Sequence, residues 1–454
     1  MYQRTRVISL VLALFFIVFH LSSCFSCGRV PLSEEEKMSL VLIGDAITLS
    51  AYSPLAAAFL AAPEYTSVKE LTDETPSLIG KKDFELLPIR IPFLAEGISD
   101  DTALCLLVSE TPDLTAAERY ECAVEDTEIL VTNLLSDTVY YARLIAEEKG
   151  EKRAESNTVS FCTPDLVRLL TIEGMKNVRD VGYLRTEDGK QIRQGFLYRG
   201  TEFDGLVAFE ATEAGMAALR RLCIKTNIDL RNDIVSRTPL YEGVTEYSYP
   251  VKQYAEAFDH SKDLYPQAIS HFAVLENYPI YTHCTYGKDR TGTLFVILEA
   301  LLGVSEEDIF RDYAMSDLSY YQPIPDEYHL LVTELSRRGS GDISLGAEKY
   351  LLDGGLSYQE ISNIRSILLS EDAVFLKKSL KKKTAVKGEI LPFTIDVRES
   401  GNAVSVTVGN VTPEFTFENG VLLVDTALLS LGEHVGSVRF ENGATLSFSF
   451  HLNK

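Results

Sequence analysis

Tryptophan is absent from the 454 residues, and methionine and histidine are scarce, at 5 and 7. Tyrosine and phenylalanine, at 22 each, must therefore supply the aromatic side chains of any core. Basic residues are also few, because 43 Lys and Arg stand against 66 Asp and Glu, for a net charge of −23. Proteins that hold DNA or RNA neutralise phosphates with basic groups, so this charge argues against a nucleic-acid partner. A phosphorylated ligand would have to be captured by a local site.

The chain lacks an apolar run of the roughly 20 residues that a membrane-spanning helix needs. Its longest run, residues 7–19, follows Arg4 and Arg6, which predicts an export signal over residues 1–23. Residues 21–24 (Leu-Ser-Ser-Cys) resemble the bacterial lipobox, in which the cysteine is lipidated and becomes the new N-terminus. We therefore expect an exported protein anchored by lipid at Cys24 on the outer side of the cell membrane. Secretion after cleavage of an ordinary signal peptide is the alternative.

No cysteine pattern indicates a metal site. The only CxxC spacing joins Cys24 and Cys27, and it lacks the second pair or histidine partners of a zinc site. Cys105, Cys122 and Cys162 are expected to be buried free thiols, and one disulfide among them, which an exported protein can form, is the alternative. The two other cysteines are Cys223 and Cys284.

Residues 85–164 consist of short β-type runs, such as 86–91, 103–108 and 139–144, separated by turn residues. This pattern predicts a β-sandwich. Residues 135–144 resemble the late-strand signature of fibronectin type III modules, and the resemblance implies that the Tyr140 hydroxyl bonds back to the backbone. The preceding residues, 24–84, form an N-terminal extension to which the sequence assigns no role.

Strand-like and helix-like segments alternate from residue 165 to 376, which favours an α/β domain. Strands are expected at 226–230 and 279–283, and helices at 294–302 and 358–369. The Lys-rich stretch 377–387 is expected to be a linker, with contact to anionic lipid as the alternative. Residues 388–454 alternate around Asn-Gly turns, which predicts a small all-β domain. The predicted fold is thus multidomain, with an α/β domain flanked by two β domains.

One segment between a predicted strand and a predicted helix carries the chemistry. It reads His283-Cys284-Thr285-Tyr286-Gly287-Lys288-Asp289-Arg290-Thr291-Gly292. Such a loop can point successive backbone N–H groups into one concavity at a helix N-terminus, which binds a phosphate dianion. The same field favours a thiolate, so Cys284 is the candidate nucleophile, and Arg290 can hold two phosphoryl oxygens with its planar fork. Cys and Arg at this spacing recur by chance, but the adjoining His, Gly and Thr-Gly residues make chance a poor explanation.

This segment resembles the signature loop of the cysteine-dependent protein tyrosine phosphatases. Its Lys-Asp pair resembles, more narrowly, a bacterial subfamily that also acts on phosphoinositides. Similar blocks occur at residues 177–182, 188–189, 197–199, 229–231, 312–313 and 355–357, so the resemblance covers about 165–370. The chain departs from the family at Tyr183, where a second glycine is usual, and at Gly200, where serine is common. We expect both departures to affect substrate contacts more than catalysis.

Chemistry and resemblance together assign roles to the loop. Cys284 attacks phosphorus, and Arg290 and the loop amides stabilise the equatorial oxygens. Asp289 is the expected general acid, because the resembling subfamily implicates an Asp within the loop. Asp229 and Asp180 are the alternatives, and each can instead form a structural salt bridge.

The remaining loop residues are expected to bind phosphate or substrate: Thr285, Tyr286, Gly287, Lys288, Thr291 and Gly292. Lys288 at the mouth of the site would favour substrates with more than one phosphate, and an exposed solubilising lysine is the alternative. His283 is expected to orient the loop, and the Thr291 hydroxyl to assist the departing sulfur. This mechanism requires no metal or cofactor.

The sequence therefore predicts an exported phosphoric monoester hydrolase that forms a cysteinyl-phosphate intermediate. Protein phosphotyrosine is the first expected substrate, and phosphoinositides or inositol phosphates are the second. A surface interaction protein with an inactive phosphatase fold is the rival. The presence of Cys284, Asp289 and Arg290 together argues against that rival.

Overall fold

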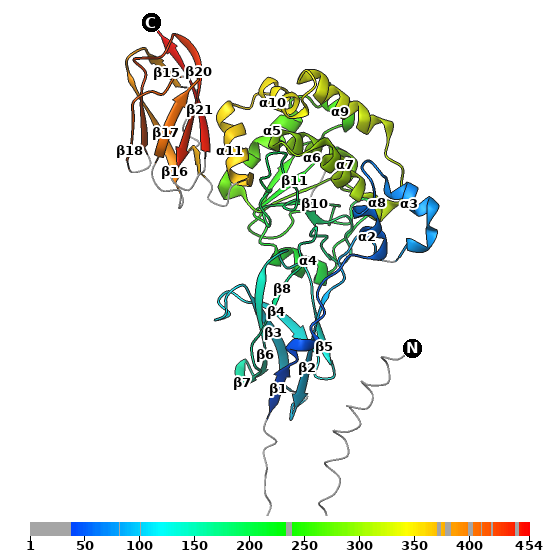
Figure 1. The fold of residues 1–454 in the computed structure, drawn as a ribbon. Helices are drawn as coiled ribbons and strands as arrows, with labels where there is room; N and C mark the ends of the chain where they lie inside the picture. Colours follow the sequence, from blue (N-terminus) through cyan, green and yellow to red (C-terminus); the bar gives the residue numbers. More distant parts are fainter. Residues whose placement is uncertain are drawn as a thin grey trace, which may run out of the picture.

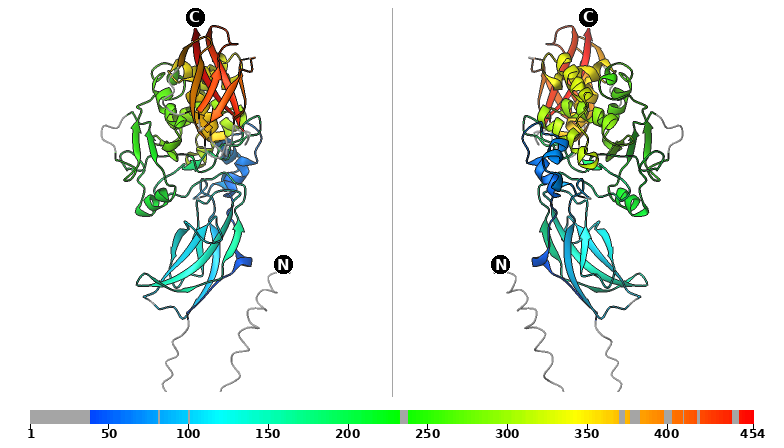
Figure 2. Two further views of the ribbon diagram at one scale, coloured as in Figure 1. Left: turned by 90° about the vertical axis from the view of Figure 1, so that its left-hand side faces the viewer. Right: turned by 90° about the vertical axis from the view of Figure 1, so that its right-hand side faces the viewer.

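The computed structural model describes residues 38–80, 82–99, 101–232, 238–369, 374–376, 383–397, 403–409, 411–418, 421–440 and 445–454. The predicted export signal, its lipobox and most of the Lys-rich stretch lie outside these residues. Within them, no helix combines the length and the apolar character needed to cross a bilayer. Three bodies follow one another along the chain: a β-sandwich, an α/β domain and a second β-sandwich (Figures 1 and 2).

The N-terminal β-sandwich has two sheets, ordered β1-β2-β5 and β4-β3-β6-β7, with β8 pairing the other end of β6. Its strands are β1 (Ser39–Leu42), β2 (Ile89–Glu96), β3 (Ala103–Ser109), β4 (Glu118–Cys122), β5 (Glu128–Val131), β6 (Val139–Glu148), β7 (Glu151–Glu155) and β8 (Val159–Cys162). Alternate residues face inward, as Ile89, Ile91 and Phe93 do on β2. The Leu135 N–H donates to the Tyr140 hydroxyl at 3.0 Å, the backbone bond expected of that tyrosine.

The extension at 24–84 does not form a separate unit in its described part, and this corrects the predicted boundary at 85. β1 pairs antiparallel with β2 and completes a sheet of the sandwich. Two short helices, α2 (Pro54–Leu60) and α3 (Val68–Glu74), instead join the core of the α/β domain through Leu55, Phe59 and Val68. The sequence could not show this division, because the partners of each element lie far along the chain.

The α/β domain contains a five-stranded sheet of order β12-β11-β13-β10-β9. Four strands are parallel, β10 (Leu197–Gly200), β11 (Thr226–Asp229), β12 (Thr245–Ser248) and β13 (Ile280–His283), and the edge strand β9 (Arg179–Asp180) is antiparallel. α4 (Glu213–Arg221) packs on one face of the sheet. On the other side α6 (Asp289–Leu302) contacts β13 and is itself contacted by α5 (Leu264–Ser270), α7 (Glu306–Met315), α9 (Asp326–Arg338) and α10 (Ile343–Asp353). The core on this side also includes residues of α8 (Asp317–Tyr320) and α11 (Tyr358–Leu369). α6 is apolar on all sides because it lies within the core. The predicted strands and helices of this region are present.

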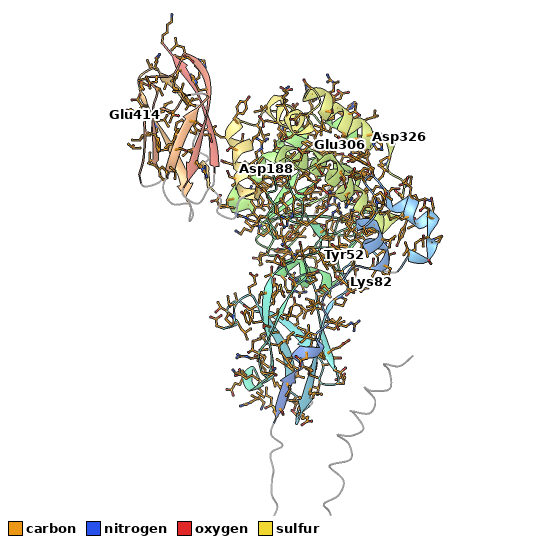
Figure 3. The ribbon with its side chains drawn as sticks, viewed as in Figure 1. Tyr52, Lys82, Asp188, Glu306, Asp326 and Glu414 are labelled. Atoms are coloured by element: carbon orange, nitrogen blue, oxygen red, sulfur yellow. The ribbon has the colours of Figure 1, made fainter. Side chains whose placement is uncertain are left out.

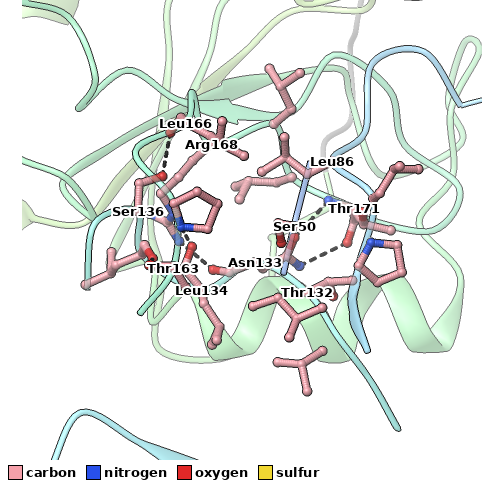
Figure 4. A pocket seen from close by; sticks show the side chains of 18 residues that line it. Ser50, Leu86, Thr132, Asn133, Leu134, Ser136, Thr163, Leu166, Arg168 and Thr171 are labelled. Atoms are coloured by element: carbon pink, nitrogen blue, oxygen red, sulfur yellow. Dashed lines mark hydrogen bonds between the residues drawn. The ribbon is translucent and has the colours of Figure 1, made fainter. Parts of the chain in front are cut away.

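A buried polar seam joins the first sandwich to the α/β domain (Figure 4). The Arg168 guanidinium donates to the carbonyls of Leu134 and Asn133, at 2.9 and 2.7 Å. The Asn133 amide donates to the Thr171 carbonyl and accepts the Thr171 N–H. A cavity of only about 20 Å³ remains between these segments. Tyr52, labelled in Figure 3, accepts the Val167 N–H at 2.7 Å. The two bodies therefore share an interface of partly buried hydrogen bonds.

The C-terminal sandwich has sheets ordered β14-β16-β19-β18 and β15-β21-β20-β17, and it packs on α11. Its strands are β14 (Val374–Leu376), β15 (Lys383–Val386), β16 (Ile390–Val397), β17 (Ala403–Val408), β18 (Phe415–Glu418), β19 (Val421–Asp425), β20 (Gly432–Phe440) and β21 (Thr445–Asn453). This corrects the predicted linker, because residues 383–386 form a strand that pairs with β21. The domain therefore begins before residue 388.

The five described cysteines are free, and so no disulfide joins Cys105, Cys122 and Cys162. Cys105 is buried and Cys162 is exposed. Burial is the main cause that raises the pKa of Cys122, to about 12.

Candidate active site

The loop of residues 284–288 connects the end of β13 to the first turn of α6. Gly287 has φ +66°, and a Cβ at this position would lie 2.4 Å from the Gly200 carbonyl oxygen. Gly200 is equally confined, because a Cβ there would lie 2.6 Å from the Tyr281 hydroxyl. The serine that is common in the family at 200 would not fit this packing.

Three successive carbonyls of the loop are held by groups from outside it. The Glu202 N–H donates to the Thr285 carbonyl at 3.2 Å. The Asn177 amide and the Tyr320 hydroxyl donate to the Tyr286 carbonyl at 3.2 and 2.7 Å, and Arg199 Nη2 donates to the Gly287 carbonyl at 3.1 Å. In a trans peptide the N–H points opposite to the C=O, so the amides of residues 286–288 face the concave side. The loop is thus a preorganised anion-binding nest.

Cys284 begins this nest and Arg290 closes it. The Cys284 side chain is 2% exposed, at the floor of the loop. Arg290 donates from Nη1 to Asn232 Oδ1 at 3.0 Å and from Nη2 to Thr285 Oγ1 at 3.2 Å. These bonds fix the guanidinium plane across the loop, where it can present two donors to a phosphoryl group.

The neighbours of Cys284 fit the roles expected of them. His283 is fully buried, and its Nδ1 lies 3.2 Å from the Cys284 carbonyl oxygen. Burial lowers the pKa of His283, which favours a neutral ring, although the charge of Asp229 opposes this effect. Among the described residues, the buried Thr291 hydroxyl has no hydrogen-bond partner, which leaves it available to the sulfur or the phosphate.

Asp289 stands at the N-terminus of α6, and the hydroxyl groups of two tyrosines lie near one of its carboxylate oxygens. Tyr254 donates to its Oδ1, and the Tyr313 hydroxyl lies 3.4 Å from the same oxygen. The half-buried carboxyl lines a pocket of about 500 Å³ together with Tyr254, Glu256 and Glu327. It is therefore open to solvent, as a group that exchanges a proton with water must be.

Lys288 is buried, which corrects the exposed solubilising lysine that the sequence allowed, and it lines the same pocket as Asp289. It is 4% exposed, and its Nζ lies 2.6 Å from Asp317 Oδ1. Burial raises the pKa of Asp317 to about 6, against the opposing influence of Lys288. Asp317 thus contacts the lysine that was expected to meet additional substrate phosphates.

The two alternative acids lie in ion pairs. Asp229 contacts Arg231 through both carboxylate oxygens, and His283 and Arg231 lower its pKa to about 2 although burial opposes them. Asp180 pairs with Arg168 in the seam to the β-sandwich, and it accepts the N–H groups of Gly182 and Gly195 at 2.8 and 2.6 Å. Both carboxylates thus hold structure, and Asp289 remains the favoured acid.

The sequence analysis missed a buried cluster behind the loop. Asp312 accepts Arg179 Nε at 2.9 Å and also pairs with Arg199, the residue that holds the Gly287 carbonyl. Tyr183 donates to Asp312 Oδ1 at 2.8 Å, so this departure from the family serves the cluster and not the substrate. The signal was present in the similar blocks at 177–182, 197–199 and 312–313, but their mutual contacts span more than a hundred positions.

Residues 170–370 match the model of the tyrosine phosphatase family. This segment is a domain of the tyrosine phosphatase family. The phosphatase domain contains the loop, Arg179, Arg199, Asp312 and Tyr254.

Two curated relatives are 28% identical to the chain. One, a Cupriavidus necator protein named "Putative tyrosine-protein phosphatase", aligns over 176 residues, which are 33% of this chain and 63% of the relative. The other, a tyrosine-protein phosphatase of Nostoc commune, aligns over 130 residues, 23% of this chain and 44% of the relative. The chain thus spans less than two thirds of either relative.

Among solved structures, the core catalytic domain of the PP-IP phosphatase SIW14 from S. cerevisiae matches 33% of this chain and 85% of its own, at 19% identity and a TM-score of 0.24. The twitchin kinase region from C. elegans matches 81% of this chain at 9% identity, with a TM-score of 0.21.

Proposed function

We propose that the phosphatase domain hydrolyses phosphate monoesters through a cysteinyl-phosphate intermediate. The observation that carries this proposal is the loop itself, in which a buried cysteine and a fixed arginine flank three amides whose carbonyls are held outward. Such a site stabilises the equatorial oxygens of a transferring phosphoryl group without reorganising during the reaction.

The first step transfers the phosphoryl group to the enzyme. The Cys284 thiolate forms an S–P bond while the P–O bond to the leaving group breaks. The leaving oxygen takes the proton of the Asp289 carboxyl, so a neutral alcohol or phenol departs. Arg290 and the amides of residues 286–288 bind the three equatorial oxygens throughout.

The second step returns the enzyme to its starting state. Asp289, now ionised, takes a proton from water as the water oxygen bonds to phosphorus. The S–P bond breaks, and the sulfur leaves as a thiolate that the Thr291 hydroxyl and the loop amides stabilise. Inorganic phosphate is released.

We propose protein phosphotyrosine as the substrate because an aromatic wall borders the loop. Tyr286 belongs to the loop and is 47% exposed, and its ring lies edge-to-face with those of Phe209 and Tyr320, each at 5.7 Å between centroids. Such a wall suits an aryl ester better than a polyanionic inositol ring. The pairing of Lys288 with Asp317 weakens one argument for phosphoinositides, that a free lysine would meet their additional phosphates.

A substrate panel tests this proposal on the full chain. Phosphotyrosyl peptides, phosphoinositides and soluble inositol phosphates are compared by release of inorganic phosphate, with Cys284→Ser as the blank. We expect phosphotyrosyl peptides to give the highest kcat/KM. The Tyr286→Ala substitution should lower kcat/KM for these peptides more than it lowers kcat/KM for alkyl phosphates. A higher kcat/KM for an inositol phosphate would overturn the substrate assignment, and no turnover of any ester would favour an inactive interaction protein.

The flanking segments support a cell-surface setting. We propose that the chain is exported and lipidated at Cys24, on the basis of the lipobox-like residues 21–24. The Cys24→Ala variant should then move from the membrane fraction to the soluble fraction, and unchanged membrane association would contradict lipidation. The strand order of the N-terminal sandwich and its Tyr140 bond support a fibronectin type III-like module.

A further inference from the structure

Tyr254 has an unusual backbone for its residue type. Its φ is +57°, in the left-handed region that a bulky side chain rarely adopts, and its side chain is 7% exposed. Strained backbone of this kind persists where surrounding contacts impose it, and it concentrates at functional sites. Here the contacts imposing it come from the first turn of α6.

The backbone and the side chain of Tyr254 both form hydrogen bonds to α6, the helix that begins at Asp289. The Tyr254 N–H donates to Thr293 Oγ1 at 2.8 Å, and the Thr293 hydroxyl donates in turn to the Asp289 carbonyl at 2.9 Å. The Tyr254 hydroxyl donates to Asp289 Oδ1. One tyrosine therefore fixes the Asp289 backbone through Thr293 and its carboxyl directly.

The direction of the hydroxyl bond is defined. Burial, followed by the charge of Asp289, raises the pKa of Tyr254, so its hydroxyl keeps its proton. The Tyr313 hydroxyl lies 2.6 Å from the Tyr254 oxygen and can donate to it, which leaves the Tyr254 proton for Asp289. With Oδ1 occupied as an acceptor, Oδ2 is the oxygen that can carry the catalytic proton.

We infer that Tyr254 is a positioning residue for the general acid, which holds Oδ1 of Asp289 so that Oδ2 faces the leaving-group oxygen. This inference rests on the proposed function, in which Asp289 is the acid. Tyr254 lies in a short 3-10 helix (η3, Tyr254–Phe258), outside the loop motif and 35 positions before Asp289. Its effect should therefore appear only where protonation of the leaving group limits the rate.

The test compares two substrates across a double-mutant cycle. Tyr254→Phe keeps the ring and removes the hydroxyl. We expect it to lower kcat on a phosphotyrosyl peptide by about tenfold, a part of the 10²–10⁴ that a general acid supplies. Turnover of an aryl phosphate with an activated leaving group should fall by less than about twofold, because that leaving group needs little protonation. When Asp289→Asn is already present, adding Tyr254→Phe should not further lower kcat on the phosphotyrosyl peptide relative to the activated aryl phosphate.

Tyr350→Phe is the matched control. Tyr350 is equally buried, and its hydroxyl donates to the Ala257 carbonyl of the same 3-10 helix at 2.9 Å, away from Asp289. A purely structural loosening of this helix would affect both variants alike and both substrates equally. Tyr313→Phe, which removes the donor behind Tyr254, serves as a second probe if Tyr254→Phe does not fold, with a smaller loss of the same selectivity expected.

Each remaining outcome overturns a separate statement. Equal slowing of both substrates by Tyr254→Phe, or additive selective losses with Asp289→Asn, would overturn the positioning role while Asp289 stayed the acid. An Asp289→Asn variant without leaving-group selectivity, in an enzyme that still requires Cys284, would overturn the assignment of the acid and with it this inference. Activity that survives Cys284→Ser would overturn the proposed function itself.

Discussion

Replacing Asp312 by Asn should destabilise the phosphatase domain far more than replacing its neighbour Glu299 by Gln. Asp312 is fully buried and neutralises two buried guanidinium groups, those of Arg179 and Arg199. Removing one partner of a buried ion pair typically costs about 3–5 kcal/mol, because the remaining charge stays uncompensated. Because this one carboxylate neutralises two cations, we expect Asp312→Asn to lower the free energy of unfolding by an amount near the upper end of that range.

Glu299 differs because its burial favours the protonated, neutral form of its carboxyl. It is buried, and burial followed by the charge of Asp312 raises its pKa well above the usual range. A protonated carboxyl and an amide have nearly the same shape and charge. Glu299→Gln should therefore change the free energy of unfolding by less than about 1 kcal/mol, within the range of a neutral exchange.

Urea unfolding followed by circular dichroism at 222 nm measures both variants. Since the described helices lie within or against the α/β domain, this signal reports on that domain. At a typical m-value, Asp312→Asn should lower the midpoint by at least about 1 M urea, and Glu299→Gln should leave it nearly unchanged. Equal large losses would show that Glu299 is ionised, and an unchanged midpoint for Asp312→Asn would refute the ion-pair cluster.

Three further predictions concern the loop and its support. Arg290→Lys should lower kcat/KM by about a hundredfold or more in steady-state assays, because a point ammonium cannot make two parallel bonds to phosphate; an unchanged value would reject the bidentate role. Thr291→Val should slow phosphoenzyme breakdown and produce a burst of phenol release without loss of thermal stability, since its hydroxyl has no partner among the described residues; a destabilised variant with normal kinetics would contradict this. The pKa of Asp229 lies at about 2, below its unfolded value, so its contribution is present above pH 4 and is lost as pH falls toward 2. That loss amounts to about 2 kcal/mol in acid titrations of unfolding, and an Asp229→Asn variant with the same acid profile as wild type would refute it.

Local patterns predicted much of the fold. Period-2 alternation identified the two sandwiches, and the apolar run at 294–302 identified the core of α6. The motif at 283–292 located the loop because its residues are consecutive and their chemistry depends on that spacing. The strands at 374–376 and 383–386 were missed, because a Lys-rich sequence resembles a linker until its pairing with β16 and β21 is known.

Contacts between distant residues could not be predicted. Lys288 was expected at the surface because its partner, Asp317, lies 29 positions later on another helix. The hydroxyl of Tyr254 reaches Asp289 through a left-handed backbone that no local pattern announces for a tyrosine. The chemical groups of the site could be predicted from the sequence. Which of them are held by other side chains depends on contacts that only the folded structure shows.

The central claim is that the phosphoryl group passes through Cys284, and trapping the intermediate tests it most directly. A phosphotyrosyl peptide is mixed with the enzyme and quenched rapidly in acid, and the digested protein is mapped by mass spectrometry. Asp289→Asn is included because it should slow hydrolysis of the intermediate. The account predicts one phosphoryl group on the sulfur of Cys284, and none in Cys284→Ser. Turnover with no phosphoryl group on Cys284 at any quench time, or with the group on another residue, would contradict it.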